Sequence, residues 1–387
     1  MVSESDRLRI VHVITKGDVG GAQTHVVELA TAQATRVDVT IVAGIDGPAL
    51  ERARDGGVAS ALVPEVGAAW SGGSLLAAYR AVRDRLVELA PDVVHGHSSH
   101  AGLLARAAAR RLRIPSVYTA HGWPFQAGAP LRQRVSSYAG ETVGAWLGDA
   151  VICLTEAEAA NARFVVPRRR LWVVPNGIAD VPVAQRRRQS GVAGPVGLVM
   201  VARFAPPKQQ PALIDAMRAL ADLDWTLIFV GDGPDRPVCE ASAAAAFPDG
   251  RVRFLGHRDD VPGLLAANDI AVLWSRYEGM PIALMEAMRA GLCCVANDLP
   301  GVHALFGGQR DGDSTGPAGV VAAGADELTS ELRRLIEHPD EIDRLGNLAR
   351  RRYLDAFTAD AMATGTRTVY DAVMSRRRGR GGGTSGR

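Results

Sequence analysis

Short runs rich in valine and isoleucine alternate with longer helical patterns through the first half of the chain. The strand candidates are Ile10–Thr15, Val39–Ala43, Val93–His97, Ser116–Ala120, Val151–Leu154 and Trp172–Val174. The helical patterns between them are Ala22–Ala34, Leu75–Leu89, Ala101–Arg111 and Leu131–Leu147. Strands buried on both faces and separated by helices predict an α/β domain with a doubly wound parallel sheet. Ligands of such a sheet bind beyond the carboxyl ends of its strands.

The same alternation restarts after one interruption, and 387 residues are enough for two domains. Residues 179–195 are rich in proline, glycine, glutamine and arginine and lack apolar periodicity, which is typical of a linker. Further strand candidates are Gly197–Val201, Thr226–Val230, Val252–Leu255, Ile270–Leu273 and Cys293–Ala296. We therefore predict two Rossmann-like domains facing a cleft that holds the site. The predicted bounds are 1–178 for the first domain, 179–195 for the linker, 196–357 for the second domain, 358–375 for a last helix and 376–387 for a disordered basic tail.

Composition and charge exclude several classes of protein. Hydrophobic residues make up 47% of the chain and charged residues 22%, and the net charge of +2 gives no overall attraction to nucleic acid. The polar N-terminal sequence is not a secretory signal, and no apolar run reaches the roughly 18 residues that a membrane span needs. We expect a cytoplasmic protein with at most peripheral, electrostatic contact with the inner face of the membrane. Metal-ligand spacing is absent among the cysteines, which are Cys153, Cys239, Cys293 and Cys294.

Two carboxylates, Glu278 and Glu286, are separated by seven intervening residues in the segment EGMPIALME. The first lies in a turn marked by Gly279, Met280 and Pro281, where a helix can begin with its N–H groups free. The second lies one turn inside that helix. A helix N-terminus attracts phosphate and carboxylates accept hydrogen bonds from sugar hydroxyls, so the pair fits a ligand with both groups. The alternative is an ordinary amphipathic helix with two solvated acids.

Two cations follow the first strand of the second half. Arg203 and Lys208 share a proline-stiffened loop that leads into a helix. Only two of the 44 basic residues are lysines, Lys16 and Lys208, and a compact ammonium serves as a point charge for phosphate. Two cations directed at one place fit a diphosphate leaving group, whose charge they stabilise without a metal. The alternative is a surface pair, and Lys16 carries no clear indication.

The first half of the chain contains two further loops that are candidates for ligand binding. Gly20 and Gly21 follow the first strand and open a helix, which lets backbone and helix terminus approach an anion. The pattern is not the GxGxxG of dinucleotide-binding proteins. His121 comes directly after a strand and before a glycine, at the edge where ligands bind. A histidine in the sequence is more often structural, and that alternative stays open.

In this order and at these strand ends, the motifs resemble those of retaining glycosyltransferases of family four, which have the two-domain GT-B fold. The resemblance implies that Glu286 holds the ribose of a nucleotide-sugar and that Glu278 and His121 lie against the donor sugar. It also implies that Gly20 and Gly21 lie on the acceptor side of the site and that the last helix crosses back to the first domain. Base contacts fall to the loops that carry Gly231, His257 and Arg258. The chain departs from the family in Lys208-Gln209, where Lys-Gly is usual, and in a loop that keeps only Gly301.

The implied reaction moves a hexosyl or N-acetylhexosaminyl group from a nucleotide-sugar donor to a saccharide, lipid-linked or aminocyclitol-type acceptor, and we expect the donor to be a UDP-sugar. Arg203, Lys208, Glu278 and His121 form the implied catalytic set, and no metal or other cofactor is required. Asp311-Gly-Asp313 mimics a metal motif of another glycosyltransferase fold but lies in a polar loop far along the chain. Two alternatives remain: a sugar-nucleotide epimerase of the same architecture, and a non-catalytic protein that binds sugar-nucleotide or nucleic acid.

Overall fold

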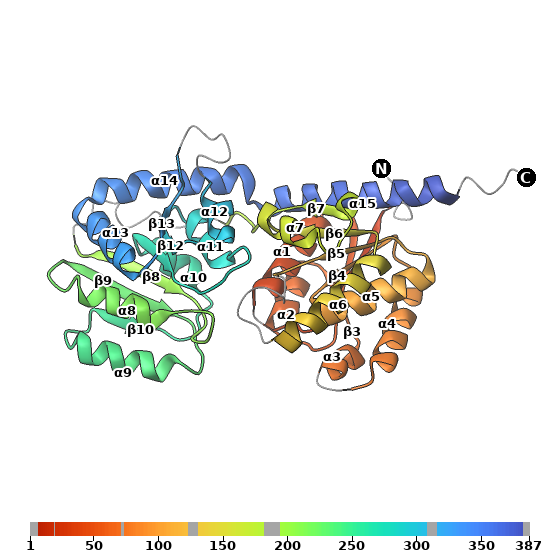
Figure 1. The fold of residues 1–387 in the computed structure, drawn as a ribbon, viewed down its shortest axis with the longest axis horizontal. Coiled ribbons are helices and arrows are strands. Elements are labelled where there is room, and N and C mark those ends of the chain that lie inside the picture. Colours follow the sequence, from red (N-terminus) through yellow and green to blue (C-terminus); the bar gives the residue numbers. More distant parts are fainter. Residues whose placement is uncertain are drawn as a thin grey trace, which may run out of the picture. The chain divides into compact units, whose positions relative to one another are not determined.

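The computed structural model describes residues 7–18, 20–70, 73–122, 131–181, 194–307 and 316–381. The chain forms two compact α/β units (Figure 1). Unit 1 comprises Met1–Ala179 and Ala359–Arg387, and unit 2 comprises Asp180–Thr358. The C-terminal helix α15 (Ala359–Gly381) therefore belongs to the same unit as the N-terminal sequence.

Unit 1 is built on a seven-stranded sheet in which every recorded pair is parallel. Its strands, in spatial order, are β3 (Ala59–Leu62), β2 (Asp38–Ala43), β1 (Arg9–Ile14), β4 (Val93–His97), β5 (Ser116–Thr119), β6 (Ala150–Cys153) and β7 (Leu171–Val173). The order changes direction between β1 and β4. A doubly wound sheet binds its ligands outside the carboxyl ends of the strands at such a switch point.

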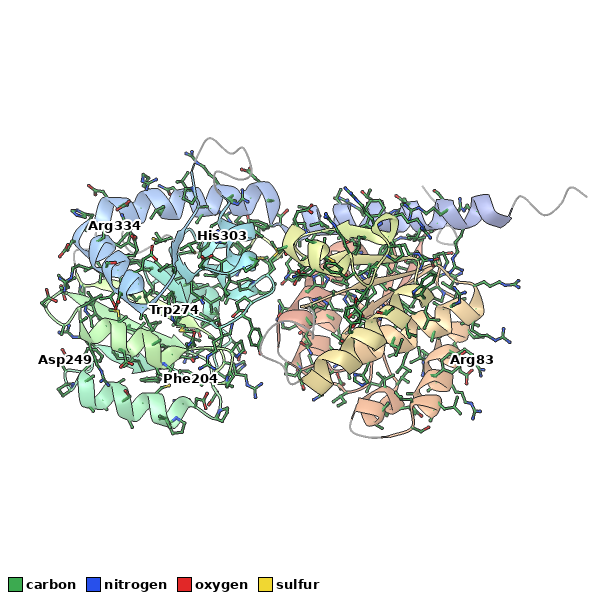
Figure 2. All side chains as sticks on the ribbon, viewed as in Figure 1. Arg83, Phe204, Asp249, Trp274, His303 and Arg334 are labelled. Atoms are coloured by element: carbon green, nitrogen blue, oxygen red, sulfur yellow. The ribbon has the colours of Figure 1, made fainter. Side chains whose placement is uncertain are left out.

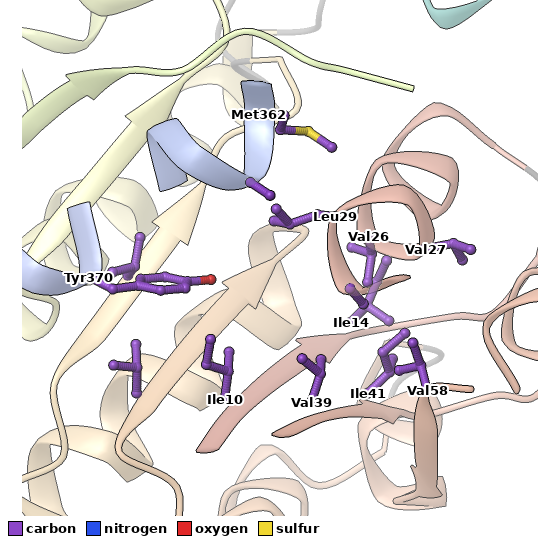
Figure 3. Close-up of a cluster of buried hydrophobic side chains, with 14 of the residues drawn as sticks. Ile10, Ile14, Val26, Val27, Leu29, Val39, Ile41, Val58, Met362 and Tyr370 are labelled. Carbon is purple, nitrogen blue, oxygen red and sulfur yellow. The ribbon is translucent and has the colours of Figure 1, made fainter. Parts of the chain in front are cut away.

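Helices cover both faces of this sheet. They are α1 (Gly21–Ala34), α2 (Pro48–Asp55), α3 (Pro64–Trp70), α4 (Leu75–Leu89), α5 (Ser99–Leu112), α6 (Leu131–Leu147), α7 (Glu156–Ala162) and α15. Ile10 and Ile14 of β1 pack in one core with Leu29 of α1 and with Met362 and Tyr370 of α15 (Figure 3). The alternate β1 positions, Val11 and Val13, pack in a second core with residues of α4 and α5. Side chains of a strand alternate between the faces, so His12 lies on the same face as Ile10 and Ile14.

Unit 2 repeats the design with six strands. In spatial order these are β10 (Val252–Phe254), β9 (Trp225–Val230), β8 (Val196–Val201), β11 (Ile270–Leu273), β12 (Cys293–Asn297) and β13 (Val320–Ala322). The helices are α8 (Gln210–Arg218), α9 (Arg236–Ala246), α10 (Val261–Ala266), α11 (Ile282–Arg289), α12 (Pro300–Phe306), α13 (Ala325–Glu337) and α14 (Pro339–Ala356). The strand order changes direction between β8 and β11. Phe204 and Trp274, in the loops that follow those two strands, are buried within the unit (Figure 2).

The predicted fold class, two doubly wound parallel sheets, is confirmed, and one predicted segment is wrong. The tail was expected to be disordered from Arg376, whereas α15 continues to Gly381. Arg376 donates to the carbonyl of Arg169 at 2.9 Å, and Arg377 donates to the Asp149 carboxylate at 2.7 Å. These bonds fix the last turns of the helix to unit 1. No helix that the structure describes has the length and hydropathy required to cross a membrane.

Glu158, in the first turn of α7, gives unit 1 a pH-dependent element. The Thr155 hydroxyl accepts from the Glu158 amide at 3.1 Å, and the Glu158 carboxylate accepts from the Leu154 amide at 2.9 Å. Burial raises the pKa of Glu158 to about 7, so its proton is retained in the folded state at pH values where the unfolded chain has lost it. A raised folded-state pKa contributes stability that is complete below the unfolded pKa and is lost as pH rises through the folded one.

We therefore expect Glu158→Gln to remove a loss of stability that the wild type shows between about pH 4.5 and pH 7. Glutamine keeps an acceptor for the Leu154 amide and carries no charge. At pH 8 the variant should be the more stable protein, by at most about 3 kcal/mol, while at pH 4 the two should agree. Urea unfolding of both proteins across this range measures the effect. Parallel pH profiles would show that Glu158 does not titrate in this way.

Candidate functional site

The switch point of unit 2 carries an ion pair between two residues predicted from the sequence. Lys208 lies in the loop after β8, and Glu278 lies in the loop after β11. The Lys208 ammonium donates to the Glu278 carboxylate, and the two side chains are only 18% and 13% exposed. The pair is largely buried but remains accessible to a ligand. It is located where a sheet of this kind binds its ligands.

Backbone hydrogen bonds hold the two loops together. The Gln209 amide donates to the Trp274 carbonyl at 2.9 Å, and the Arg276 amide donates to the Pro207 carbonyl at 3.0 Å. Asn297, at the end of β12, accepts from the Ser275 amide at 3.1 Å and donates to the Ser275 carbonyl. Lys208 and Glu278 are therefore positioned by the framework before any ligand arrives. Asn297 is absent from the sequence-based predictions because a side chain that fixes a neighbouring loop leaves no motif.

Arg203 shares the loop of Lys208, but its side chain is exposed. Within the part of the chain that the structure describes, it forms no ion pair. Its carbonyl accepts from the Gln210 side-chain amide at 3.0 Å, which attaches the start of the loop to α8. The structure thus joins Lys208 with Glu278 and leaves the Arg203 guanidinium accessible to an anion.

Pro281 directly precedes α11 in an extended conformation, with φ −72° and ψ 116°, and no side chain caps the helix. Glu286 is half-buried one turn inside, as predicted from the spacing. The adjacent turn is packed tightly against α12: a Cβ added to Gly301 would lie 1.6 Å from the Gly279 carbonyl oxygen. The one glycine that this loop keeps is therefore required for the contact.

The predicted base-binding loops lie beside the same switch point. Gly231, just after β9, has φ +133°, and a Cβ there would lie 2.2 Å from the Ala202 carbonyl oxygen. Its amide donates to the Gly256 carbonyl at 2.8 Å, which joins this loop to the one that carries His257 and Arg258. Both of those side chains are exposed. Arg258 forms two hydrogen bonds to Asp260, at 2.8 and 2.7 Å, so its guanidinium is already engaged.

In unit 1, His121 follows β5 and is half-buried. It belongs to a chain of imidazoles that the sequence did not reveal. Its Nε2 lies 3.2 Å from Nδ1 of His97, Nε2 of His97 lies 3.0 Å from Nδ1 of His12, and Nε2 of His12 lies 2.9 Å from the Gln33 side-chain oxygen. Burial lowers the pKa of His12 to about 4 and those of His97 and His121 well below their ordinary value. The rings are therefore neutral near pH 7.

The histidines at positions 12, 95 and 97 occupy alternate positions of β1 and β4, on the face that packs against α1 and α15. In the sequence, the only indication of this imidazole chain is that polar residues stand at strand positions expected to be buried. That indication does not identify the residues with which they form hydrogen bonds. Gly20 precedes α1, which has no side-chain cap and no acid in its first turn. The amides of that turn are therefore not neutralised by a local carboxylate. Lys16 is partly exposed and lies 3.9 Å from Asp18.

Some predicted features fall outside the described residues. They are Asp311, Asp313 and most of the predicted linker.

Both units match known glycosyltransferase families. The family described as Glycosyltransferase Family 4 matches residues 19–180, and the one described as Glycosyl transferases group 1 matches residues 195–338. The chain belongs to glycosyltransferase family 4. Its Lys208–Glu278 pair lies in the region that matches group 1, and its histidine chain lies largely in the region that matches family 4.

This family 4 chain is similar to two named relatives and to one solved structure. It is 29% identical over 237 residues to the UDP-Gal:α-D-GlcNAc-diphosphoundecaprenol α-1,3-galactosyltransferase of Escherichia coli, a match that covers 57% of this chain and 61% of that enzyme. It is 26% identical over 309 residues to the α-D-kanosaminyltransferase of Streptomyces kanamyceticus, covering 73% and 77%. The structure of Anabaena Alr3699/HepE in complex with UDP-glucose matches with a TM-score of 0.77 at 21% identity, covering 95% of this chain and 100% of that one. The predicted GT-B fold is thereby confirmed.

Proposed function

We propose that this family 4 glycosyltransferase moves a hexosyl or N-acetylhexosaminyl group from a UDP-sugar to an acceptor hydroxyl, with retention of anomeric configuration and without a metal ion. The observation that carries the proposal is the preorganised Lys208–Glu278 pair at the switch point of unit 2. Two proteins that the chain resembles support UDP as the nucleotide. The name of the Escherichia coli enzyme specifies UDP-Gal, and the Anabaena protein is complexed with UDP-glucose.

The diphosphate is assigned to the cations of the loop after β8. Lys208 is a localised charge beside Glu278, and Arg203 adds an exposed guanidinium at the start of the same loop. As the bond between the anomeric carbon and the diphosphate breaks, negative charge grows on the leaving oxygen. Fixed cations stabilise that charge most strongly where it develops. The acceptor oxygen forms the new bond on the same face, and its proton passes to the departing phosphate.

The sugar and the ribose are assigned to the carboxylates and to His121. Glu278 is held by Lys208 and can accept from sugar hydroxyls with its remaining lone pairs. Glu286 lies near the uncapped start of α11, a position that suits a carboxylate accepting ribose hydroxyls. For His121, the resemblance implies a contact with the donor sugar, and its neutral ring can donate or accept one hydrogen bond.

A lipid-linked or other saccharide is the acceptor class that we favour. The name of the Escherichia coli relative specifies a diphosphoundecaprenol-linked GlcNAc. On unit 1, Arg376 donates to the carbonyl of Arg169, so the arginines at 168–170 and those at 376–378 lie side by side. Exposed arginines there support peripheral contact with an anionic lipid surface.

Glu286→Ala is expected to weaken UDP binding by about 1.5–3 kcal/mol, since it removes a charged acceptor of ribose hydrogen bonds. Isothermal titration calorimetry of UDP into the folded variant measures this. Glu337→Ala, which removes an exposed carboxylate from α13 of the same unit, is the control and should bind UDP like the wild type. An affinity unchanged by Glu286→Ala would remove this residue from the ribose site.

The function is tested by incubating the protein with a panel of nucleotide-sugars, with and without acceptors, and identifying released nucleotide and products by mass spectrometry. Glycosyl transfer releases UDP together with a product heavier than the acceptor by one sugar residue. A sugar-nucleotide epimerase would instead convert the donor with no acceptor present. A protein that binds UDP-sugar and converts it in neither setting would contradict the proposal.

A further inference from the structure

Three imidazoles from separate elements converge at the carboxyl edge of the unit 1 sheet. His25 comes from α1, His97 ends β4, and His121 follows β5. One ligand nitrogen from each lies within 4.8 Å of the other two. The ring centroids of His25 and His121 are 4.7 Å apart, and those of His97 and His121 are 5.4 Å apart. Imidazole nitrogen is the commonest protein ligand of transition metals, so the cluster has the donors of a metal site.

His25 presents a nitrogen that nothing else occupies. Its Nδ1 lies 2.8 Å from the Asn176 side-chain oxygen, which only accepts, so Nδ1 carries the proton and Nε2 keeps its lone pair. Nε2 is fully buried and has no hydrogen-bond partner among the residues that the structure describes. The ring is 2% exposed and held in orientation by Asn176. Metal-binding histidines are oriented in this way by a hydrogen bond from the other ring nitrogen.

One ring nitrogen of His97 is likewise left with a lone pair, here through two successive hydrogen bonds that begin at Gln33. The Gln33 side-chain oxygen accepts from Nε2 of His12, at 2.9 Å, which leaves the lone pair on Nδ1 of His12. Nε2 of His97, 3.0 Å away, therefore donates to that lone pair. The remaining nitrogen, Nδ1 of His97, keeps a lone pair directed at His121. Gln33 and His12 thus fix the tautomer that a ligand at Nδ1 requires.

The spacing agrees with tetrahedral coordination. Nδ1 of His97 and Nε2 of His121 are 3.2 Å apart. Two nitrogens bound to a tetrahedral zinc ion at about 2.0–2.1 Å lie about 3.3 Å from each other. Two of the three ligands are therefore already spaced for the ion, and His25 has to approach by no more than about 1.5 Å.

The deeper group of His12, His95 and His97 fits a metal less well. Nδ1 of His95 lies 2.7 Å from the Tyr370 hydroxyl, and Nε2 lies 2.8 Å from the Thr119 hydroxyl. Both nitrogens of His12 are likewise bonded, to Gln33 and to His97. A metal there would have to break these bonds. The outer group needs to give up only the bond between His97 and His121.

We propose that His25, His97 and His121 form a three-histidine site for a divalent transition metal such as Zn²⁺, with the fourth position open. Borderline-soft ions of this kind accept imidazole ligands and tetrahedral geometry. The metal is not a cofactor of transfer. It sequesters His121, so it acts as a reversible inhibitor, a consequence that rests on the function proposed above.

The test uses the full-length protein freed of metal with EDTA, desalted, and titrated with Co²⁺, whose visible absorption becomes intense in tetrahedral sites. We expect one equivalent to produce this absorption and Zn²⁺ to displace it. His25→Ala and His97→Ala should each weaken Co²⁺ binding at least about 10-fold, and Asn176→Ala about 10–100-fold as an orienting residue. His257→Ala and His303→Ala, which remove exposed imidazoles from unit 2, are matched controls and should bind Co²⁺ like the wild type.

The wild-type titration requires no variant, so the absence of a tetrahedral spectrum contradicts the proposal even if a variant fails to fold. A tetrahedral spectrum that depends on His25 and His97 supports the site, whatever the transfer assay shows. A spectrum without tetrahedral intensity, or one unchanged in both folded variants, overturns it. Inhibition of transfer by Zn²⁺ is measured separately and tests the proposed role of His121.

Discussion

Replacing Lys208 with alanine is expected to lower kcat about 10²–10³-fold, the scale seen when one preorganised electrostatic donor is removed from a transition state. Lys208 is held beside Glu278 by backbone bonds between the loops after β8 and β11, so its charge is fixed before the donor binds. The variant also leaves the Glu278 carboxylate without its cation. Steady-state kinetics of UDP release, with the KM for donor measured in parallel, give the effect. The loss should lie mainly in kcat.

The only other lysine of the chain supplies the control. Lys16 is partly exposed and lies 3.9 Å from Asp18 in unit 1. Lys16→Ala removes the same charge and should leave kcat within about twofold, because exposed pairs contribute little. Equal effects of the two substitutions would show that overall charge matters and the position of Lys208 does not. Arg203→Ala should resemble Lys208→Ala if both cations face the diphosphate.

Gly301→Ala is expected to cost both stability and activity. The added methyl group would lie 1.6 Å from the Gly279 carbonyl oxygen, a separation that atoms cannot reach, so α12 must move away from the turn that carries Glu278. Overpacking of this kind costs about 1–3 kcal/mol. Because the displaced turn also positions Glu278, a shift of about 1 Å can cost up to about 100-fold in rate. Urea unfolding and kinetics on the same samples measure the two losses.

Gly263 provides the matched control in unit 2. It lies in α10, and a Cβ there would meet nothing within 4 Å. Gly263→Ala should keep full activity and stabilise the protein slightly, by up to about 1 kcal/mol, since alanine is the better helix former. A Gly301→Ala variant as stable and active as Gly263→Ala would contradict the described packing of α12 against Gly279.

Much of the fold could be predicted because apolar periodicity reports burial. β4 and β11 were predicted with the bounds that the structure gives, since each lies between two helical patterns; β11 is a continuous apolar run, and β4 begins with two valines. β3 and β13 were missed for a physical reason. ASAL contains no β-branched or aromatic residue, and VVA has only three residues, so neither carries a pattern that separates a strand from its surroundings.

The candidate site divides in the same way. Lys208 and Glu278 could be proposed because each follows a strand, and carboxyl ends of parallel strands gather at one edge. Their direct pairing could not be predicted, since it depends on loop conformations fixed by Asn297. The imidazole chain from Gln33 to His121 joins residues of α1, β1 and β4 and the end of β5. Such contacts arise only from the packing of the sheet.

The proposed reaction is retaining, metal-independent transfer from a UDP-sugar. The most direct measurement is proton NMR of the anomeric signals while the enzyme, in excess EDTA, converts a UDP-α-sugar and an acceptor identified by the panel. We expect UDP release together with an α-configured product, at a rate that EDTA does not lower and that Lys208→Ala reduces about 10²–10³-fold. A β-configured product, or a reaction that stops in EDTA and returns with Mn²⁺, would contradict it.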